Sequence, residues 1–474
     1  MTYKESSTRT SPHADIDSWA SQEFGRVCLG DKRLERRLKV IATDFARQPR
    51  ASIPKACGSW AQSKGAYRFF DNRGVSAEAI LESHRMATIE RMGAEKLLFA
   101  IQDTTFLNYT DRPNTSGLGP IGNNSDKTKG LIAHCTLVVN PEGVAMGVID
   151  ASILARKREQ FGDNKRRNQK PIQEKESFRW LEGFRAVQRA SALLPQGCQV
   201  VSVADREADI YDLLALATEK GNRVGLLVRA QHDRGVEHEE NRLWKWLRSQ
   251  PVAATLGVEV PACVGRKRRV AILSIRFSKV ALKCPLLKEG RSTLHLWGVE
   301  ALENNPPSGV EPICWKLLTT VAVDSAKDAI ERVLWYKLRW QIEVFHKILK
   351  SGCQIEERQL ESAQRLKRCA AVDMVVAWRI LHLTIQSRYT PNAPASCFLE
   401  EYEWKALHCF IHKTNLPPAE PPSMSKAIGW IAQLGGFLNR KSDGYPGPVT
   451  LWRGLHRLND IAEAYLVFNP PTCG

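Results

Sequence analysis

The spacing of apolar residues changes near residue 97, and this change separates a helical segment from a strand-rich one. Between residues 16 and 90 the apolar positions follow helical spacing, as in the set Leu29, Leu34, Leu38, Ile41 and Phe45. Such spacing places apolar side chains along one face of a helix, so we predict that residues 16–90 are mostly helical. From residue 97 short apolar runs alternate with stretches rich in Gly, Asn and Pro, which is typical of β-strands.

The segment from 97 to 230 predicts a mixed sheet flanked by helices. Three strands come first and are followed by alternating helices and strands, an order that suits an α/β core. The expected strands are 97–107, 131–139, 144–154, 200–204 and 223–230, and the expected helices are 179–194 and 207–220. From about 235 to 312, short alternating strands with Gly and Pro breaks indicate an inserted β-rich subdomain.

The last third of the chain predicts helices again. A helix is expected at about 327–350 and another from 361 to about 387, and no regular element is expected between Pro391 and Pro422. Two more helices are expected at 426–439 and 450–467. We therefore divide the chain into an N-terminal helical domain (1–92), an α/β core (93–365) with its insertion, and a C-terminal helical region (366–474).

The charge balance points to a polyanionic partner. Lys and Arg outnumber Asp and Glu by 68 to 51, a net charge of +17 on 474 residues, which favours nucleic acid ahead of acidic membrane surfaces. No window approaches the ~20 apolar residues of a membrane span. Residues 1–18 lack the apolar stretch of a signal peptide, and the twelve cysteines form no C-x-x-C pair. We expect a cytoplasmic, nucleoid-associated protein with reduced thiols and no membrane partner.

The helix expected at 327–350 carries an unusual polar face. On a helical wheel of ~100° per residue, one arc about 100° wide holds Tyr336, Arg339, Trp340, Glu343, Lys347 and Lys350. The opposite, apolar face holds Leu334, Leu338, Ile342, Phe345 and Leu349. A carboxylate can hold a metal, cations can bind phosphates, and aromatic rings can stack on bases. A solvated polar face is the alternative interpretation.

Three acids from distant parts of the sequence are candidates for one metal site. Asp103 lies in the middle of the first expected strand, and Asp205 follows the strand at 200–204 directly. Glu343 belongs to the polar helix face. Phosphoryl transfer needs carboxylates that converge on divalent ions. The alternatives are that Asp205 caps the next helix and that Asp103 pairs with an arginine. We expect Glu207 and Asp209 to pair with neighbouring cations.

Several blocks of residues are similar to one family of DNA-processing enzymes. Tyr336, Arg339, Glu343 and Lys350 match the Y-R-E-K signature of the IS-four family of bacterial cut-and-paste transposases, with two, three and six residues between them. The segments 101–105 (IQDTT) and 205–210 (DREADI) resemble the first and second catalytic strands of the Tn-five-like members. Further similar blocks lie at 65–69, 75–80 and 434–437, so the resemblance runs in order from about residue 25 to 467.

The resemblance implies a fold and a reaction. It implies an RNase H-like core with a β-rich insertion, an N-terminal helical DNA-binding domain and a C-terminal dimerisation region. It implies that Asp103, Asp205 and Glu343 hold two Mg²⁺ ions, with Mn²⁺ as a substitute. A metal-bound water would nick one strand at a transposon end. The freed 3′-hydroxyl would form a hairpin, which is reopened before strand transfer into target DNA.

The resemblance also implies DNA contacts and partners. Tyr336, Arg339 and Lys350 would hold phosphates, Trp315 would receive a flipped base, and Trp340 would brace that base. The polar arc adds Lys347, and the basic residues of the N-terminal domain are matched by Arg37, Arg47 and Arg68. The expected partners are double-stranded DNA, as transposon ends and as target, and a second copy of the chain in a synaptic homodimer.

Two other functions are compatible with the same residues. One is an RNase H-like structure-selective nuclease that hydrolyses DNA but never joins it. The other is a catalytically silent DNA-binding inhibitor. The phosphate-binding face around Tyr336 argues against the first, because plain hydrolysis needs no hairpin clamp, and three intact acids argue against the second. The segment 386–425 matches nothing in the resemblance, and the sequence recognised at the ends is not encoded in any visible motif.

Overall fold

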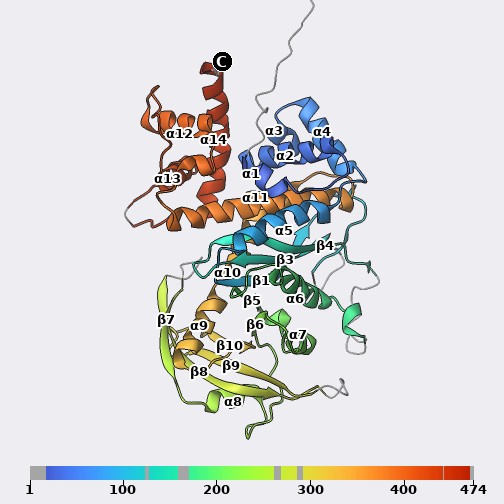
Figure 1. Cartoon of the computed structure of the whole chain (residues 1–474), viewed down its shortest axis with the longest axis vertical. Helices are drawn as coiled ribbons and strands as arrows, with labels where there is room; N and C mark the ends of the chain where they lie inside the picture. The colour runs from blue at the N-terminus through green and yellow to red at the C-terminus, as the bar shows by residue number, and fades with distance from the viewer. Residues whose placement is uncertain are drawn as a thin grey trace, which may run out of the picture.

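The computed structural model describes residues 18–122, 127–158, 170–260, 268–285, 292–440 and 442–469. The N-terminal residues on which the prediction about a signal peptide rests lie almost wholly outside these ranges. A large mixed sheet fills one half of the molecule (Figure 1). Helices from both ends of the chain pack together in the other half, and the long helix α11 runs between the two halves. The predicted class, a mixed sheet with helical termini, is confirmed.

Within the described residues, ten strands form one sheet in the order β2-β3-β1-β5-β6-β10-β9-β8-β7, with β4 paired to β3. Strands β1, β3 and β4 are antiparallel neighbours, whereas β5 and β6 run parallel to β1. The strands are β1 Leu97–Asn108, β2 Gly119–Pro120, β3 Lys129–Val139, β4 Ala145–Leu154, β5 Gln199–Ala204, β6 Gly225–Arg229, β7 Ala254–Val260, β8 Arg269–Leu282, β9 Leu294–Glu303 and β10 Cys314–Thr319.

The helices of the sheet region differ from the prediction at one place. Helix α6 (Phe178–Ser191) is found where it was expected, but the helix expected at 207–220 is a short 3₁₀ turn (Arg206–Ala208) followed by α7 (Tyr211–Ala217). The cause is Asp209, which separates the two pieces. Its buried carboxylate accepts hydrogen bonds from the backbone N–H groups of Gln231 and His232, at 2.8 and 2.9 Å, and this holds the chain away from helical geometry.

The strands predicted for the insertion continue the sheet. Strand β10 pairs antiparallel with β6 on one side and with β9 on the other, and β8 and β7 follow β9. Helix α8 (Leu243–Ser249) also belongs to this segment. The insertion therefore shares backbone hydrogen bonds with the core, which fixes its position relative to the core strands.

Five N-terminal helices confirm the helical prediction for the described part of residues 16–90. They are α1 Ser18–Phe24, α2 Lys32–Arg47, α3 Ile53–Cys57, α4 Trp60–Asp71 and α5 Ala77–Met92. Polar side chains cap three of them by accepting hydrogen bonds from free N–H groups of the first turn. These caps are Asp31 for α2, Ser59 for α4 and Ser76 for α5.

The C-terminal region contains one helix that the sequence analysis missed. Its helices are α11 Ala363–Tyr389, α12 Glu401–His412, α13 Met424–Leu434 and α14 Pro448–Phe468. Helix α12 lies inside the stretch between Pro391 and Pro422 that was expected to be irregular. The prolines of that stretch all lie outside α12, and Glu400 and Glu403 form a reciprocal capping box at its start. Proline content alone was therefore a misleading guide.

Helix α11 is the one helix among the described residues that is long and apolar enough, by length and composition, to span a membrane. Most of its apolar window, 83%, is buried inside the fold. Such burial is what a core helix of a folded domain shows.

The single helix predicted at 327–350 is bent. Helix α9 (Ala326–Lys337) and helix α10 (Trp340–Lys347) are joined by a tightened turn, in which Leu338 and Arg339 donate N–H bonds to residues three positions earlier. A single helical wheel cannot describe both α9 and α10, because the turn changes the angular positions of side chains in one helix relative to the other. The predicted faces are therefore wrong before the turn: Tyr336 is only 5% exposed, whereas Leu334 is 42% exposed.

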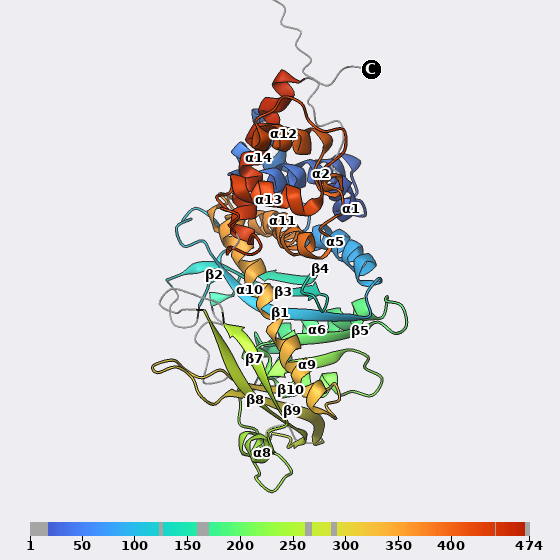
Figure 2. The same cartoon turned by 90° about the vertical axis from the view of Figure 1, so that its left-hand side faces the viewer.

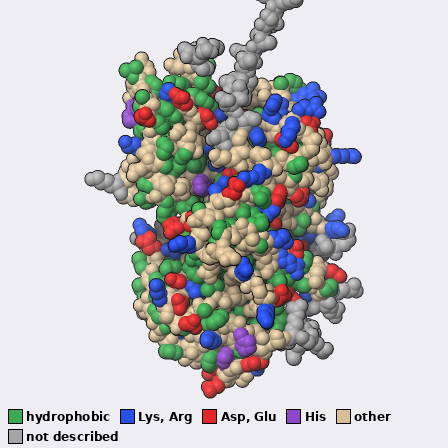
Figure 3. Space-filling view, viewed as in Figure 1, with side chains coloured by type: hydrophobic (Ala, Val, Ile, Leu, Met, Phe, Trp, Pro, Cys, Tyr) green, Lys and Arg blue, Asp and Glu red, His purple; other side chains and the backbone are tan. Residues whose placement is uncertain are grey.

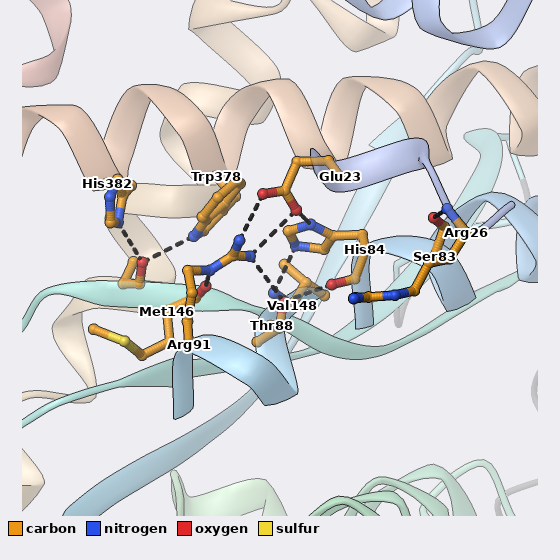
Figure 4. A network of polar contacts seen from close by, with 11 residues as sticks. Glu23, Arg26, Ser83, His84, Thr88, Arg91, Met146, Val148, Trp378 and His382 are labelled. Carbon is orange, nitrogen blue, oxygen red and sulfur yellow. Dashed lines mark hydrogen bonds and ion pairs between the residues drawn. The ribbon is translucent and has the colours of Figure 1, made fainter. Parts of the chain in front are cut away.

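A buried polar network joins the N-terminal helices to the sheet and to α11 (Figure 4). Glu23 of α1 contacts His84 of α5 at 2.5 Å (Oε2 to Nδ1) and accepts a hydrogen bond from Arg91 at 2.6 Å. Arg91 donates to the carbonyl of Met146 in β4 and lies over the ring of Trp378 in α11. Four elements thus meet at one fully bonded cluster.

Candidate active site

The sheet brings the first two acids to the same level. Strands β1 and β5 are parallel neighbours in which Gln102 lies opposite Ala204. Asp103 follows Gln102 within β1, and Asp205 follows Ala204, the last residue of β5. Because parallel strands advance in the same direction, both acids lie at the carboxyl-terminal side of this pair. The sequence analysis placed Asp103 in mid-strand and Asp205 at a strand end, and the register makes these two positions adjacent.

Helix α10 supplies the third acid. This helix packs against β1 (Figure 2). Its Glu343 forms an ion pair with Arg339, one turn earlier, and the guanidinium of Arg339 lies 4.0 Å from Asp103 Oδ2. One arginine is therefore shared between two of the three carboxylates. The side chains of Asp103 and Glu343 are 19% and 35% exposed, so both sit at the boundary between core and solvent.

The pKa of Asp103 reflects the charges that surround its carboxylate. Burial raises this pKa most, the backbone N–H of Thr104 lowers it through a 2.8 Å hydrogen bond, and the charges of Asp205 and Glu343 raise it further. Arg339 lowers it, and the result is a pKa of about 7. Only nearby charges have such effects in a protein. Asp205 and Glu343 therefore lie close enough to Asp103 for their charges to affect it.

The donor chemistry of this site fits Mg²⁺. Carboxylate oxygens are the hard ligands that Mg²⁺ prefers, and a cation would relieve the repulsion that raises the pKa of Asp103. Arg339 is paired with Glu343, and in the part of the chain that the structure describes no group of three or more His, Cys, Asp or Glu side chains is arranged as metal ligands. The assignment of the three acids as ligands stays a prediction.

The alternatives for the acids are also partly realised. Asp205 Oδ1 accepts the N–H of Glu207 at 2.8 Å, so Asp205 does cap the 3₁₀ turn that follows β5. Its second oxygen is not used in this cap. Asp209 forms an ion pair with Arg234 at 2.6 Å, and Glu207 lies 3.8 Å from Arg179. The prediction that Glu207 and Asp209 pair with neighbouring cations is confirmed.

Tyr336 and Trp315 form an aromatic pair beside the acids. Their rings meet edge to face with centroids 5.3 Å apart, and the guanidinium of Arg339 lies 5.9 Å from the Tyr336 ring. Burial raises the pKa of Tyr336. Arg229, at the end of β6, also contacts Tyr336 and donates to the carbonyl of Cys314. The sequence analysis missed Arg229; an arginine that closes a buried strand was the available signal.

The remaining predicted contacts lie on α10 and on the turn that follows it. Trp340 is 60% exposed and Lys347 is exposed. Lys350 is partly buried and lies 3.8 Å from Glu356. The exposed face of α10 is therefore aromatic and basic, as predicted, and it begins at Trp340 after the bend.

A histidine that the sequence analysis did not consider lies against Asp103. His346 of α10 is buried, and its Nδ1 is 3.8 Å from Asp103 Oδ2. Its position three residues after Glu343 was visible in the sequence. A Glu-x-x-His spacing on a helix puts both side chains on one face.

The three N-terminal arginines have different surroundings. Arg68 is exposed on α4, on a face that also carries Trp60 (80% exposed), Lys64 and Tyr67. Arg37 is hydrogen-bonded to Gln62 and packs against Gly65. Arg47 lies 3.3 Å from Glu403 of α12 and is only 17% exposed, so its charge is directed to a contact within the protein. Their roles in DNA binding stay predictions.

Basic side chains gather over the N-terminal helices (Figure 3). The exposed ones on or next to α2, α3 and α4 include Lys32, Arg33, Arg36, Lys55, Lys64, Arg68 and Arg73. Clustered cations on one small helical unit are the electrostatic feature expected of a nucleic-acid-binding surface.

Two segments of the chain match known protein families. Residues 16–75 match a transposase DNA-binding domain, and residues 375–467 match the dimerisation domain of Tn5 transposase. The second match includes residues 386–425, which the sequence analysis could not assign. The three acids lie between the two matched segments.

The chain is also similar to a solved structure of piggyBac transposase in a synaptic complex with hairpin DNA. The two share 13% identity with a TM-score of 0.31, over 73% of this chain and 63% of that chain. This likeness is remote, and the chain spans less than two thirds of that chain's length. The family assignment rests on the two matched segments, which stand at opposite ends of the chain in the order that the resemblance predicts. These two matches together support a transposase of the Tn5 and IS4 type.

Proposed function

We propose that the protein is a cut-and-paste DNA transposase, which binds the inverted-repeat ends of its element, nicks them, forms and reopens a hairpin, and joins the ends to target DNA. The observation that carries this proposal is the placement of Asp103 and Asp205 after paired residues of β1 and β5, with Arg339 between Asp103 and Glu343, beside an exposed basic and aromatic helix face. The DNA-binding and dimerisation domains at the two ends of the chain support it.

The strand arrangement supports an RNase H-like core. Strands β4, β3 and β1 are consecutive antiparallel neighbours, and β5 and β6 extend the sheet parallel to β1. The first acid stands on the central strand β1 and the second follows the adjacent strand β5. This mixed arrangement supports the RNase H-like core that the resemblance implies, and the insertion is attached to it through β10.

Phosphoryl transfer to and from DNA needs positive charge on the attacking and leaving oxygens, and a pair of Mg²⁺ ions supplies it when bound. Asp103, Asp205 and Glu343 would hold these ions, and Mn²⁺ would be accepted by the same oxygen ligands. Arg339 would have two partners. Its guanidinium offsets the charge of Glu343 in this structure, and it would bind a DNA phosphate once Glu343 holds a metal ion.

The aromatic residues beside the acids suit a hairpin. A tight DNA hairpin needs an unstacked nucleotide, and an aromatic surface lowers the cost of unstacking. Trp315 would receive that base, because it stands next to Tyr336 and is only partly buried. Trp340 would brace it from the exposed side, while Lys347 and Lys350 would contact the neighbouring phosphates.

The proposed partners are double-stranded DNA and a second copy of the chain. The exposed basic face of α4 would contact the transposon end. The C-terminal helices leave large apolar side chains exposed, which suits a surface that is buried in a dimer. These side chains are Phe410, Leu416, Val467 and Phe468. We propose the cytoplasmic nucleoid as the place of action, because both the substrate and the product are chromosomal DNA.

A labelled duplex that carries the element's own ends, incubated with the protein and Mg²⁺, tests the proposal. Nicked, hairpin and target-joined products are expected in that order. Glu343→Gln should abolish all three, because it removes one ligand charge, while end binding in a gel-shift titration stays nearly unchanged.

The other outcomes identify the competing functions. Nicks without joined products would indicate a structure-selective nuclease, and a shifted but uncut duplex would indicate a silent DNA-binding protein. Full nicking by the Glu343→Gln variant would remove Glu343 from the metal site.

A further inference from the structure

His346 is a buried polar side chain that the proposed chemistry does not yet use. It lies on α10 one turn after Glu343, and its side chain is 9% exposed. Its Nδ1 faces Asp103 Oδ2 at 3.8 Å. Within the described residues its Nε2 is buried and has no hydrogen-bond partner. A buried ring nitrogen that lacks a partner costs free energy, so another contact of this ring must offset that cost.

The two oxygens of Asp103 are held in different ways. Oδ1 accepts the backbone N–H of Thr104 at 2.8 Å, which fixes it to strand β1. Oδ2 faces Arg339, in the turn before α10, at 4.0 Å and His346 of α10 at 3.8 Å. Both distances exceed a hydrogen bond, and catalytic hydrogen bonds are often long before the substrate is bound. The orientation of Oδ2 therefore depends on α10.

Arg339 cannot orient Asp103 throughout the reaction if it also binds a DNA phosphate. When its guanidinium turns to DNA, His346 is the α10 side chain that stays beside Oδ2. The His346 side chain is buried and shorter than that of arginine, so it cannot turn outward to contact DNA. Glu343 and His346 also share one turn of a rigid helix, so a single element would set the positions of two carboxylates relative to each other.

We propose that His346 is a positioning residue for Asp103: its Nδ1–H donates a hydrogen bond to Oδ2 and keeps that carboxylate directed at the divalent cation. This inference rests on the proposed function, because it assumes that Asp103 is a metal ligand. Outer hydrogen bonds of this kind orient metal-binding side chains, and their loss lowers metal affinity about 10–100-fold.

Two substitutions separate positioning from packing. In His346→Asn the amide nitrogen replaces Nδ1, whereas in His346→Gln the amide reaches the place of Nε2. A positioning role through Nδ1 predicts that Asn preserves metal affinity and Gln does not. A packing role predicts that both variants lose thermal stability and that their metal affinities change alike.

The test is Mn²⁺ binding to the full-length protein without DNA, measured as free Mn²⁺ by electron paramagnetic resonance. We expect the His346→Gln variant to bind about 10-fold more weakly than the parent, and the His346→Asn variant to stay within about threefold of it. Circular dichroism and thermal unfolding in EDTA establish that each variant is folded. Equal affinity of parent and His346→Gln, or equal loss in both variants, would overturn the inference.

Two further measurements keep the result unambiguous. Asp205→Asn should abolish Mn²⁺ binding at the three acids. If the parent protein had no Mn²⁺ site that depends on Asp205, both the proposed function and this inference would be overturned. In the parent protein, ¹⁵N-histidine NMR should place the His346 proton on Nδ1 and show its signal move when Mg²⁺ is added. A proton on Nε2 that ignores Mg²⁺ would overturn the positioning role even if the Gln variant failed to fold.

Discussion

At the scale of single residues, Asp103 is placed where its charge is costly without a cation. Burial, Asp205 and Glu343 together raise its pKa to about 7 from an ordinary value of 3.8, against the lowering effects of Thr104 and Arg339. Because the folded-state pKa is the higher one, the metal-free folded protein holds this proton more tightly than the unfolded chain. The stability that the proton contributes is present at low pH and is lost as the pH rises from about 4 through about 7.

This linkage predicts the behaviour of Asp103→Asn. In EDTA at pH 8 the variant should be more stable than the parent by about 1–3 kcal/mol, because it removes a charge that the parent must carry. The difference should shrink as the pH falls below 7. Urea unfolding at pH 8 and pH 5 measures both values. Excess Mg²⁺ should favour the parent instead, and a variant that is less stable than the parent in EDTA at pH 8 would contradict the prediction.

Trp315 allows a test of hairpin formation that leaves the three acids unchanged. Trp315→Ala should slow hairpin formation about 10–100-fold, because the stacking surface for the unpaired base is lost, and should affect the first nick much less. Single-turnover assays on labelled ends measure the two steps separately. The matched control is Trp246→Ala, which removes a partly buried tryptophan of α8 that stacks on His238. An equal loss of both steps in Trp315→Ala would count against the flipped-base role.

At the scale of elements, the bend between α9 and α10 determines which residues are available. The turn at Leu338 and Arg339 buries Tyr336 against Trp315 and leaves Trp340 on the surface. A straight helix would give both rings similar exposure. The bend therefore divides the signature residues into a buried group that shapes the site and an exposed group that can meet DNA.

Helix α4 presents the exposed basic face of the N-terminal domain. Arg68→Ala should weaken binding to the transposon end about 10-fold and reduce the slope of log affinity against log salt by about 1, because one phosphate contact is lost. Gel-shift titrations at several salt concentrations measure both quantities. Lys220→Ala removes an exposed charge beyond α7 and serves as the matched control. An unchanged salt slope for Arg68→Ala would show that Arg68 does not contact a phosphate.

At the scale of the whole molecule, buried ion pairs connect parts that are distant in sequence. Glu23 links α1 to α5, and Arg91 carries the contact on to β4 and α11 (Figure 4). Val148 N–H donates to His84 Nε2 at 3.0 Å, which leaves the His84 proton on Nδ1, facing Glu23. Burial lowers the pKa of His84, and Arg91 supplies a positive charge beside Glu23.

This network predicts an acid-sensitive junction. Burial alone would raise the pKa of Glu23, but His84 and Arg91 outweigh it and lower the pKa to about 2 from 4.5. The stability from this carboxylate is therefore present above about pH 4.5 and is lost as the pH falls towards 2. Glu23→Gln should cost about 2–4 kcal/mol at pH 7, because Arg91 is left without its buried partner.

Chemical denaturation at pH 7 and pH 3.5 tests this junction. The difference between parent and Glu23→Gln should narrow by about 1 kcal/mol at the lower pH. The control is Glu90→Gln on α5, which removes an exposed partner of Arg26 and should cost less than about 1 kcal/mol. A pH-independent difference would mean that Glu23 is not ionised in the folded protein.

Much of the fold could be predicted because its elements have strong local signals. The strands β1, β3, β4, β5 and β6 have short apolar runs between turn residues, and their order was predicted correctly; the two-residue β2 was not predicted. The elements that were missed have individual causes. Helix α12 was hidden by prolines that flank it, the helix after Asp205 was shortened by long-range hydrogen bonds of Asp209, and the bend before α10 has no Gly or Pro to announce it.

The sequence by itself determined the residue types of this protein and their local spacing. It shows the three acids, the cations and aromatic rings around Glu343, the helical ends and the positive charge. These features can be predicted because the periods of helices and strands are set by the local backbone. Only the tertiary structure decided which of these residues meet. The parallel register of β1 and β5 placed Asp103 beside Asp205, the bend of α9 and α10 buried Tyr336, and packing turned Arg47 towards Glu403 and His346 towards Asp103. Contacts of this kind depend on burial and on partners far along the chain, and no local pattern records them.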